Sequence, residues 1–174
     1  MSYNILPGFS AVATRYDMAL IDLWGVVHNG KTPYPGVLDC LEQMRVAGIT
    51  RILLSNAPRR AVAVARQIEG FGVSPDAYDH IVSSGEVTYR ALRDGLPTLR
   101  GRSRYLYCGP EKDTNFLEGL NFEPVSAIEE AGFLLVAGLR NDETETAEDY
   151  DDVLRVALAR DLPLVCVNPD ISVM

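Results

Sequence analysis

Short apolar runs alternate with helical patterns along the first half of this 174-residue chain. Three runs have the length of buried strands: "MALI" (18–21), "RILL" (51–54) and "HIVSS" (80–84). The two intervals carry apolar residues at helical spacing, namely Val37, Leu41 and Met44 in the first and Val64, Ile68 and Phe71 in the second. Alternating strands and helices are typical of parallel α/β sheets. The pattern therefore predicts an α/β fold with a doubly wound, Rossmann-like parallel sheet.

From about Gly85 the same alternation begins again. Further strands are predicted at "RYLYCG" (104–109), "FLLVAG" (133–138) and "PLVCVNPD" (163–170). One further helix is predicted from an apolar face made of Tyr150, Val153, Leu154, Ala157 and Leu158. The second half of the chain is therefore interpreted as a second small α/β unit.

The three cysteines, Cys40, Cys108 and Cys166, lie far apart and in or beside apolar runs. They show no CxxC or histidine-rich spacing, so they are interpreted as reduced core residues rather than metal ligands or nucleophiles. No apolar run reaches the ~18 residues that a membrane span needs, and the N-terminal residues lack a secretory signal pattern. We therefore expect a cytoplasmic protein that does not bind membranes.

The formal net charge of −8 arises in one segment, residues 141–152, which holds seven acids and no base. Outside this segment 17 acids face 16 bases. Acids favour the positive end of a helix dipole, so the segment is interpreted as an exposed helix start. The only basic cluster is "RGRSR" (100–104), which disfavours nucleic acid as a partner.

Polar residues follow the three predicted strands of the first half. Asp22 ends the first strand, Ser55 and Asn56 end the second, and Ser83 and Ser84 end the third. Ligands bind at the carboxyl ends of strands in a doubly wound sheet. A carboxylate there can act as a nucleophile or bind a divalent metal, and a Ser-Asn pair that enters a helix can hold a phosphate. Each feature can also be local, with Asp as a turn former and Ser-Asn as a helix cap.

The spacing of two of these residues is informative. Asp22 and Ser55 lie 33 residues apart, which is the length of one strand-helix-strand crossover. Adjacent parallel strands would bring them to the same edge of the sheet.

Three ordered motifs resemble a known family. "DLWGVVHNGKTPYPG", "LLSNAPRR" and "VCVNPD" are similar, in order and spacing, to the haloacid dehalogenase-like (HAD) superfamily. They resemble subfamily IIA in particular, which includes NagD-like sugar-phosphate, p-nitrophenylphosphate and phosphoglycolate phosphatases. The resemblance implies the N-terminal part of a HAD core at residues 1–84, incomplete in this chain, and an α/β cap domain of the C2 type at residues 85–174.

The resemblance also implies a mechanism and a set of ligands. Asp22 matches the family's nucleophile, which forms an aspartyl-phosphate, and Ser55 matches a phosphate ligand, with Asn56 lining the same pocket. Mg²⁺ is the implied cofactor, held by Asp22 and by the backbone carbonyl of Trp24. A small phosphorylated metabolite is the implied substrate, and the family pattern is compatible with a homo-oligomer formed through the cap.

Two departures from the family pattern bear on turnover. Trp24 replaces the family's second aspartate, a general acid and base, and an indole exchanges no proton near neutral pH. Loss of a general acid costs ~10²–10⁴ in rate, so another group must serve or the leaving group must depart unaided. The family's lysine and further metal-binding aspartates follow the cap, whereas this chain has only Lys31 and Lys112. We therefore expect the chain to be the N-terminal portion of a longer protein.

Further residues have two interpretations each. His28 can replace the missing acid, although a solvent-exposed loop histidine is favoured. Arg59 and Arg60 can supply positive charge to a phosphate, although an exposed helix start is favoured. For the whole chain the leading hypothesis is a phosphatase-like hydrolase, and the alternative is a catalytically silent phosphometabolite-binding or regulatory module. A receiver-like domain phosphorylated on Asp22 would leave residues 85–174 unexplained.

Overall fold

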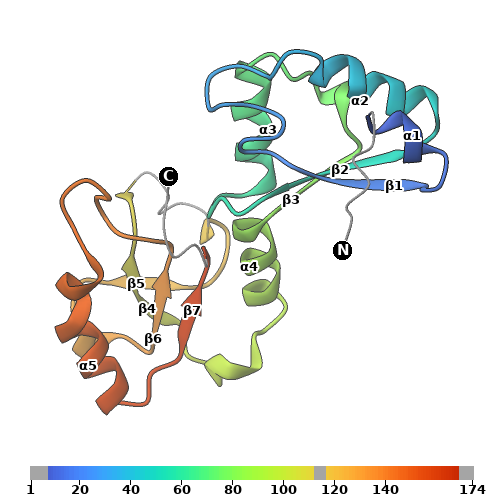
Figure 1. The fold of residues 1–174 in the computed structure, drawn as a ribbon. Coiled ribbons are helices and arrows are strands. Elements are labelled where there is room, and N and C mark those ends of the chain that lie inside the picture. The colour runs from blue at the N-terminus through green and yellow to red at the C-terminus, as the bar shows by residue number, and fades with distance from the viewer. Residues whose placement is uncertain (1–7, 112–116, 169–174) are drawn as a thin grey trace, which may run out of the picture. The chain divides into compact units, whose positions relative to one another are not determined.

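A computed structural model describes residues 8–111 and 117–168 of the chain (Figure 1). The chain forms two compact units. The first takes the residues up to Ser55 together with Ala61–Val82, and the second takes Asn56–Arg60 together with the residues from Ser83 on. Each unit is built around its own sheet.

The first unit contains a three-stranded sheet with the order β1-β2-β3. Its elements are α1 (Ser10–Ala13), β1 (Met18–Asp22), α2 (Val37–Val46), β2 (Thr50–Ser55), α3 (Ala61–Gly70), a 3-10 helix (Pro75–Ala77) and β3 (His80–Ser83). Strand β1 pairs with β2 in parallel, with Met18 opposite Thr50 and Asp22 opposite Leu54. The three predicted strands and the two predicted helices are confirmed.

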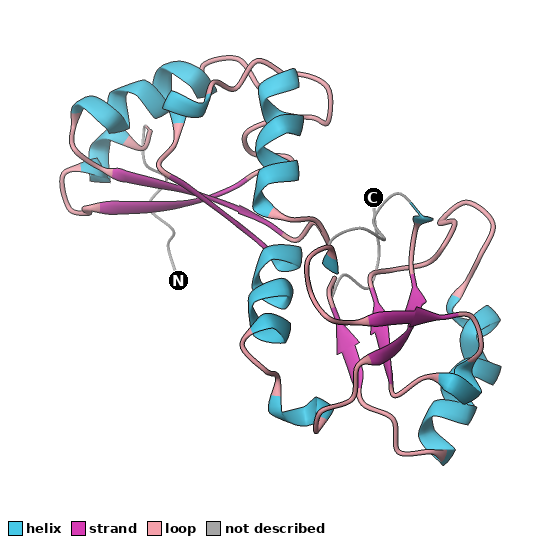
Figure 2. Ribbon diagram, turned by 180° about the vertical axis from the view of Figure 1, so that it is seen from behind, coloured by secondary structure: helices cyan, strands magenta, loops and turns pink. Residues whose placement is uncertain are grey.

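The two helices α2 and α3 lie on the same side of this sheet (Figures 1 and 2). Right-handed crossovers between successive neighbours in the order β1-β2-β3 require this arrangement. Ala19 and Ile21 of β1 pack on that side against α2. The alternate residues point the other way, and Met18 and Leu20 are 52% and 63% exposed. Strand β1 therefore presents an apolar face to solvent.

A buried arginine ties β2 to the segment before β3. The Nε and Nη2 atoms of Arg51 each donate at 3.0 Å to the carboxylate of Asp79, and the main-chain N–H of Arg51 donates to it at 2.7 Å. Nη1 donates to the carbonyls of Leu41 and Asp76. The side-chain hydrogen bonds from Arg51, followed by its main-chain bond, lower the pKa of Asp79 from 3.8 to about 2. Arg51 therefore joins β2 to the middle of α2 and to the segment before β3.

The second unit contains a four-stranded parallel sheet with the order β5-β4-β6-β7. Its helices are α4 (Ser84–Arg93) and α5 (Asp151–Ala159), with 3-10 helices at Pro97–Leu99, Ile128–Glu130 and Ala147–Tyr150. Its strands are β4 (Arg104–Cys108), β5 (Glu123–Val125), β6 (Phe133–Val136) and β7 (Leu164–Cys166). Both halves of the chain thus have the predicted α/β fold class with parallel, Rossmann-like pairing.

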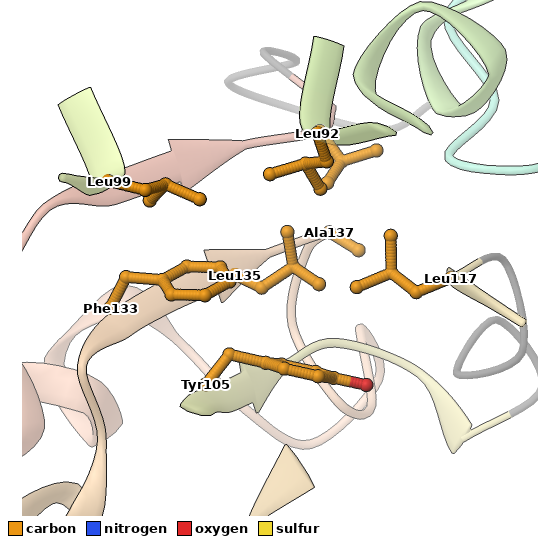
Figure 3. Close-up of a cluster of buried hydrophobic side chains, with 8 residues drawn as sticks. Leu92, Leu99, Tyr105, Leu117, Phe133, Leu135 and Ala137 are labelled. Atoms are coloured by element: carbon orange, nitrogen blue, oxygen red, sulfur yellow. The ribbon is translucent and has the colours of Figure 1, made fainter. Parts of the chain in front are cut away.

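Apolar clusters cover both faces of the second sheet. On one face Leu92 of α4 packs with side chains from β4, β6 and neighbouring loops. Figure 3 draws eight residues of this cluster and labels Leu92, Leu99, Tyr105, Leu117, Phe133, Leu135 and Ala137. On the other face Ala157 of α5 packs with Cys108 and Leu134. Because β6 lies between the two clusters, Phe133, Leu134 and Leu135 are all fully buried.

Several sequence expectations need correction. The apolar pattern did not single out α4. Strand β7 is shorter than the predicted run 163–170, and Pro169, Asp170 and Lys112 lie outside the described residues. The prediction of a core cysteine is wrong for Cys166, which is exposed because β7 lies at the edge of its sheet.

The expectation for the acidic segment agrees with the structure. The acidic segment is largely exposed and leads into α5, which begins at Asp151. Within residues 8–111 and 117–168, no group of three or more His, Cys, Asp and Glu side chains could hold a metal ion. No helix in the same ranges is long and apolar enough to cross a membrane.

Candidate active site

The carboxylate of Asp22 stands at the carboxyl end of β1. The residue is exposed, and its Oδ1 atom accepts the main-chain N–H of Leu23 at 2.9 Å. The same N–H lies 3.1 Å from the carbonyl oxygen of Leu54, which ties the end of β1 to the end of β2. Because Asp22 pairs with Leu54, Ser55 is one residue further along β2, at the carboxyl end of that strand. The structure therefore brings Asp22 and Ser55 to the same edge of the first sheet, as the spacing predicts.

Ser55 and Asn56 occupy the end of β2 but do not begin a helix. Ser55 is half-buried at the last position of the strand, and Asn56 is exposed. The prediction that the pair enters α3 is wrong, because α3 begins only at Ala61. Asn56 is the first residue of the segment that groups with the second unit, whereas Ser55 belongs to the first.

The start of α4 holds the segment 56–60 in a non-helical conformation. The N–H of Gly85 donates to the carbonyl of Ala57 at 3.1 Å, and the hydroxyl of Ser83 donates to the carbonyl of Arg59 at 2.6 Å. A Cβ atom at Gly85 would stand 2.4 Å from the nitrogen of Arg59, so this approach requires glycine. Ser83, a candidate strand-end ligand, is thus buried and engaged in holding this segment.

Arg60 also contacts α4. Its Nε atom donates to Glu86 at 2.7 Å, and its guanidinium lies 3.4 Å above the ring centre of Tyr89. Arg90 donates to the other carboxylate oxygen of Glu86 at 3.0 Å. The hydrogen bond to Glu86 raises the pKa of Arg60. The favoured expectation of an exposed helix start is therefore wrong for Arg60, which anchors its segment to α4, and Arg59 is likewise half-buried.

A tight loop follows β1 and carries Trp24. The N–H groups of Val27 and His28 both donate to the carbonyl of Leu23, and the N–H of Gly25 donates to the carbonyl of His28. The exposed indole lies directly against Gly30, where a Cβ atom would stand 2.5 Å from Cζ3 of the indole. Gly30 also has a φ of 88°, which favours glycine. The loop therefore holds a large aromatic side chain at the surface beside Asp22.

His28 is buried, at 5% exposed, which contradicts the expectation of a solvent-exposed loop histidine. Its ring packs against Phe71 at a centroid distance of 5.1 Å and against Trp24 at 5.9 Å. Its Nδ1 atom accepts the N–H of Gly30 at 2.9 Å, so the neutral ring carries its proton on Nε2. Burial lowers the pKa of His28, and the nearby charge of Asp22 raises it by less. The ring is therefore a neutral group that fixes the loop.

The oxygen donors near Asp22 have the chemical character that Mg²⁺ requires. Protein sites for this ion commonly supply one or two carboxylates, and phosphate and water supply the other ligands. Asp22 offers one carboxylate. Among the described residues, no main-chain hydrogen bond ends on the carbonyl oxygen of Trp24. These residues fit an ion that takes its remaining ligands from a phosphate and from water.

A carboxylate at the carboxyl end of a strand lies where ligands bind in parallel α/β domains, a class that hosts many different activities. A family model described as "Haloacid dehalogenase-like hydrolase" matches residues 19–123. The chain belongs to the haloacid dehalogenase-like hydrolase family.

Known proteins similar to this chain include a haloacid dehalogenase-like hydrolase from Brucella suis. Its crystal structure has 38% identity and a TM-score of 0.84, covering 96% of this chain and 62% of that one. The structure of 4-nitrophenylphosphatase from Thermotoga maritima has 23% identity and a TM-score of 0.67, covering 92% of this chain and 57% of that one. At this identity the similarity supports the fold alone. D-glycerol 3-phosphate phosphatase from Mycobacterium tuberculosis is 26% identical over 149 residues, which are 86% of this chain and 39% of that protein.

The family match confirms the resemblance to the haloacid dehalogenase-like superfamily. The chain spans less than two thirds of the length of each of these proteins. A structure of the mycobacterial glycerol phosphate phosphatase was determined in complex with magnesium.

Proposed function

We propose that the protein is a Mg²⁺-dependent, phosphatase-like hydrolase that acts on a small phosphorylated metabolite. The observation that carries this proposal is the position of Asp22, at the sheet edge that it shares with Ser55, in a chain of this hydrolase family. The relative named as a phosphatase supports the choice of a phosphate ester as substrate.

In the proposed reaction Asp22 is the nucleophile. One oxygen of its carboxylate forms a bond to phosphorus, and the bond between phosphorus and the leaving-group oxygen breaks, with the electron pair going to that oxygen. Water then attacks the aspartyl-phosphate, which releases inorganic phosphate and restores Asp22. Ser55 and Asn56 are the proposed phosphate ligands. Asp22 and the carbonyl of Trp24 would hold a Mg²⁺ ion, which would supply positive charge that offsets the repulsion between carboxylate and phosphate.

The proposal also assigns the parts of the chain. Residues 1–84 are the N-terminal part of the HAD core and residues 85–174 are the C2-type cap. The lengths of the relatives favour a site completed by residues outside this chain. The proposed protein is cytoplasmic, with no nucleic acid or membrane partner, and forms homo-oligomers through the cap.

The test is release of inorganic phosphate from a panel of small phosphate esters by a protein that also carries the residues proposed to complete the site. Asp22→Asn should reduce release to background, and removal of Mg²⁺ by a chelator should do the same. Asp17→Asn is the matched control, because Asp17 is an exposed carboxylate that precedes the opposite end of β1. Full activity in Asp22→Asn, or no release from any ester with Mg²⁺ present, would overturn the proposal.

Trp24 favours a second candidate, a catalytically silent module that binds phosphometabolites. The indole stands where the family has its proton donor, and His28 beside it is buried with Nδ1 already bonded. Calorimetric titration that finds Mg²⁺-dependent binding without turnover would support this module. A gain of phosphate release in Trp24→Asp would instead show a hydrolase that the indole limits.

A further inference from the structure

The loop that follows Asp22 exposes several apolar side chains. Trp24 is 58% exposed, Val26 is 50% exposed and Tyr34 is 39% exposed. Leu23, between Asp22 and Trp24, is buried, so the side chains on either side of it project away from the core. Binding sites for small molecules commonly combine an apolar, aromatic wall with a few placed polar groups.

The exposed indole is held in place by the loop. It lies against Gly30 on one side and meets the buried ring of His28 at an interplanar angle of 87°. The loop itself is closed by the N–H of Tyr34, which donates to the carbonyl of Val27 at 3.0 Å. Within the loop, the side-chain oxygen of Asn29 accepts hydrogen bonds from the main-chain N–H groups of Lys31 and Thr32. A surface that is ordered before binding loses less conformational entropy when a ligand arrives.

We propose that the indole of Trp24 is the binding surface for the leaving group of the substrate, and that this leaving group carries an aromatic ring. The inference rests on the proposed function, because it takes the phosphoryl group to bind at Asp22. Indole binds flat apolar rings by stacked or edge contacts. It donates no proton to a leaving oxygen, and an aryl oxygen, being a weaker base than an alkyl oxygen, departs more readily without one.

The test measures binding apart from turnover. The probes are phenylphosphonate and methylphosphonate, which share a phosphoryl-like group and differ in the ring, each titrated by calorimetry with Mg²⁺ present. We expect phenylphosphonate to bind about tenfold more tightly, which is the size of one good aromatic contact. Because Trp24 is the only tryptophan, its fluorescence should also become less accessible to acrylamide when phenylphosphonate binds.

Substitutions test whether the indole of Trp24 causes the preference for phenylphosphonate over methylphosphonate. Trp24→Ala should remove the preference for phenylphosphonate, and Trp24→Phe should keep most of it. Tyr16→Ala is the matched control, because Tyr16 is also 58% exposed but precedes the opposite end of β1. It should leave both affinities unchanged.

Three results would overturn the inference: equal affinities for the two phosphonates, a preference that persists in Trp24→Ala, or no binding of either. Failure of the proposed function gives a different result. Trp24-dependent binding of phenylphosphonate without phosphate release from phenyl phosphate would leave the inference standing and remove the hydrolase. Phosphate release with an unchanged preference in Trp24→Ala would do the reverse.

Discussion

The two sheets of the protein bury their apolar residues differently. In the second sheet, β6 is buried on both faces, because α4 and α5 contribute to separate clusters on either side. In the first sheet, β1 alternates between residues packed on α2 and exposed residues such as Leu20. Parallel sheets are usually covered on both faces, so the open face of β1 is the unusual one.

The difference identifies where the first unit is open to ligands. Successive residues of a strand point to opposite faces, so Met18, Leu20 and Asp22 share one face of β1. The candidate nucleophile therefore lies on the solvent-facing side. The second unit, with both faces covered, should be the more resistant to local opening, because more of its apolar surface is buried.

The largest expected effect is in the second unit. Phe133→Ala should lower the free energy of unfolding of this unit by about 3–5 kcal/mol, because removal of this fully buried ring of β6 leaves a cavity beside Tyr105 and Phe122. Amide hydrogen exchange in β4 and β6 measures the loss. Trp24 fluorescence, which reports on the first unit, should keep its urea midpoint. A loss below about 1 kcal/mol would show that the cluster in Figure 3 is not a tight core.

The next effect concerns the contact between α4 and the segment 56–60. Gly85→Ala places a Cβ atom against the main chain of Arg59, and overpacking of this kind costs about 1–3 kcal/mol. Gly70→Ala is the matched control at the end of α3, because nothing lies within 4 Å of the added atom. It should be neutral or stabilising by up to ~1 kcal/mol. Equal urea midpoints for the two variants would contradict the close approach at Gly85.

Much of the fold could be predicted because buried strands need continuous apolar residues, as in "RILL" and "FLLV". Helix α4 was missed although Ser83 and Glu86 have the spacing of a helix N-cap. In the structure the hydroxyl of Ser83 does accept the N–H of Glu86. The N-cap pattern was present in the sequence, but Ser83 was interpreted as a strand-end residue because it directly follows a predicted strand.

The candidate site was predictable only where it follows from the sheet. Asp22 and Ser55 lie at one edge of the sheet because adjacent parallel strands end there. The burial of His28 depends on Phe71, which follows α3 and is remote in the sequence. The late start of α3 depends on hydrogen bonds from the start of α4. Contacts between distant segments leave no local pattern, so the residues alone could not reveal them.

A smaller effect is expected at the ion pair of the first unit. Asp79→Asn removes the charge that Arg51 pairs with, and should cost about 1 kcal/mol, because the Asp79 side chain is 39% exposed and solvent screens the pair. Urea unfolding at pH 7 measures this cost. Asp94→Asn, in the more exposed pair with Arg93, is the control and should leave the urea midpoint unchanged.

The same pair predicts a dependence on pH. The pKa of Asp79 is lowered from 3.8 to about 2 in the folded protein. The contribution of the ionised Asp79 to the free energy of unfolding is therefore present above about pH 4, and it is lost as the pH falls from about 4 through about 2. The stability difference between the wild type and Asp79→Asn should shrink over that window. A difference that stays constant from pH 5 to pH 2 would show that the charge of Asp79 is not what Arg51 stabilises.

The smallest expected effect tests the open face directly. Leu20→Ala should change the free energy of unfolding by less than about 0.5 kcal/mol, because the side chain is largely exposed. Leu53→Ala is the matched control on the covered face of the same sheet, where Leu53 is fully buried, and should cost about 2–5 kcal/mol. Trp24 fluorescence during urea unfolding measures both. If Leu20→Ala costs as much as Leu53→Ala, the face of β1 is covered in solution, and sedimentation equilibrium would then show whether a second copy of the chain covers it.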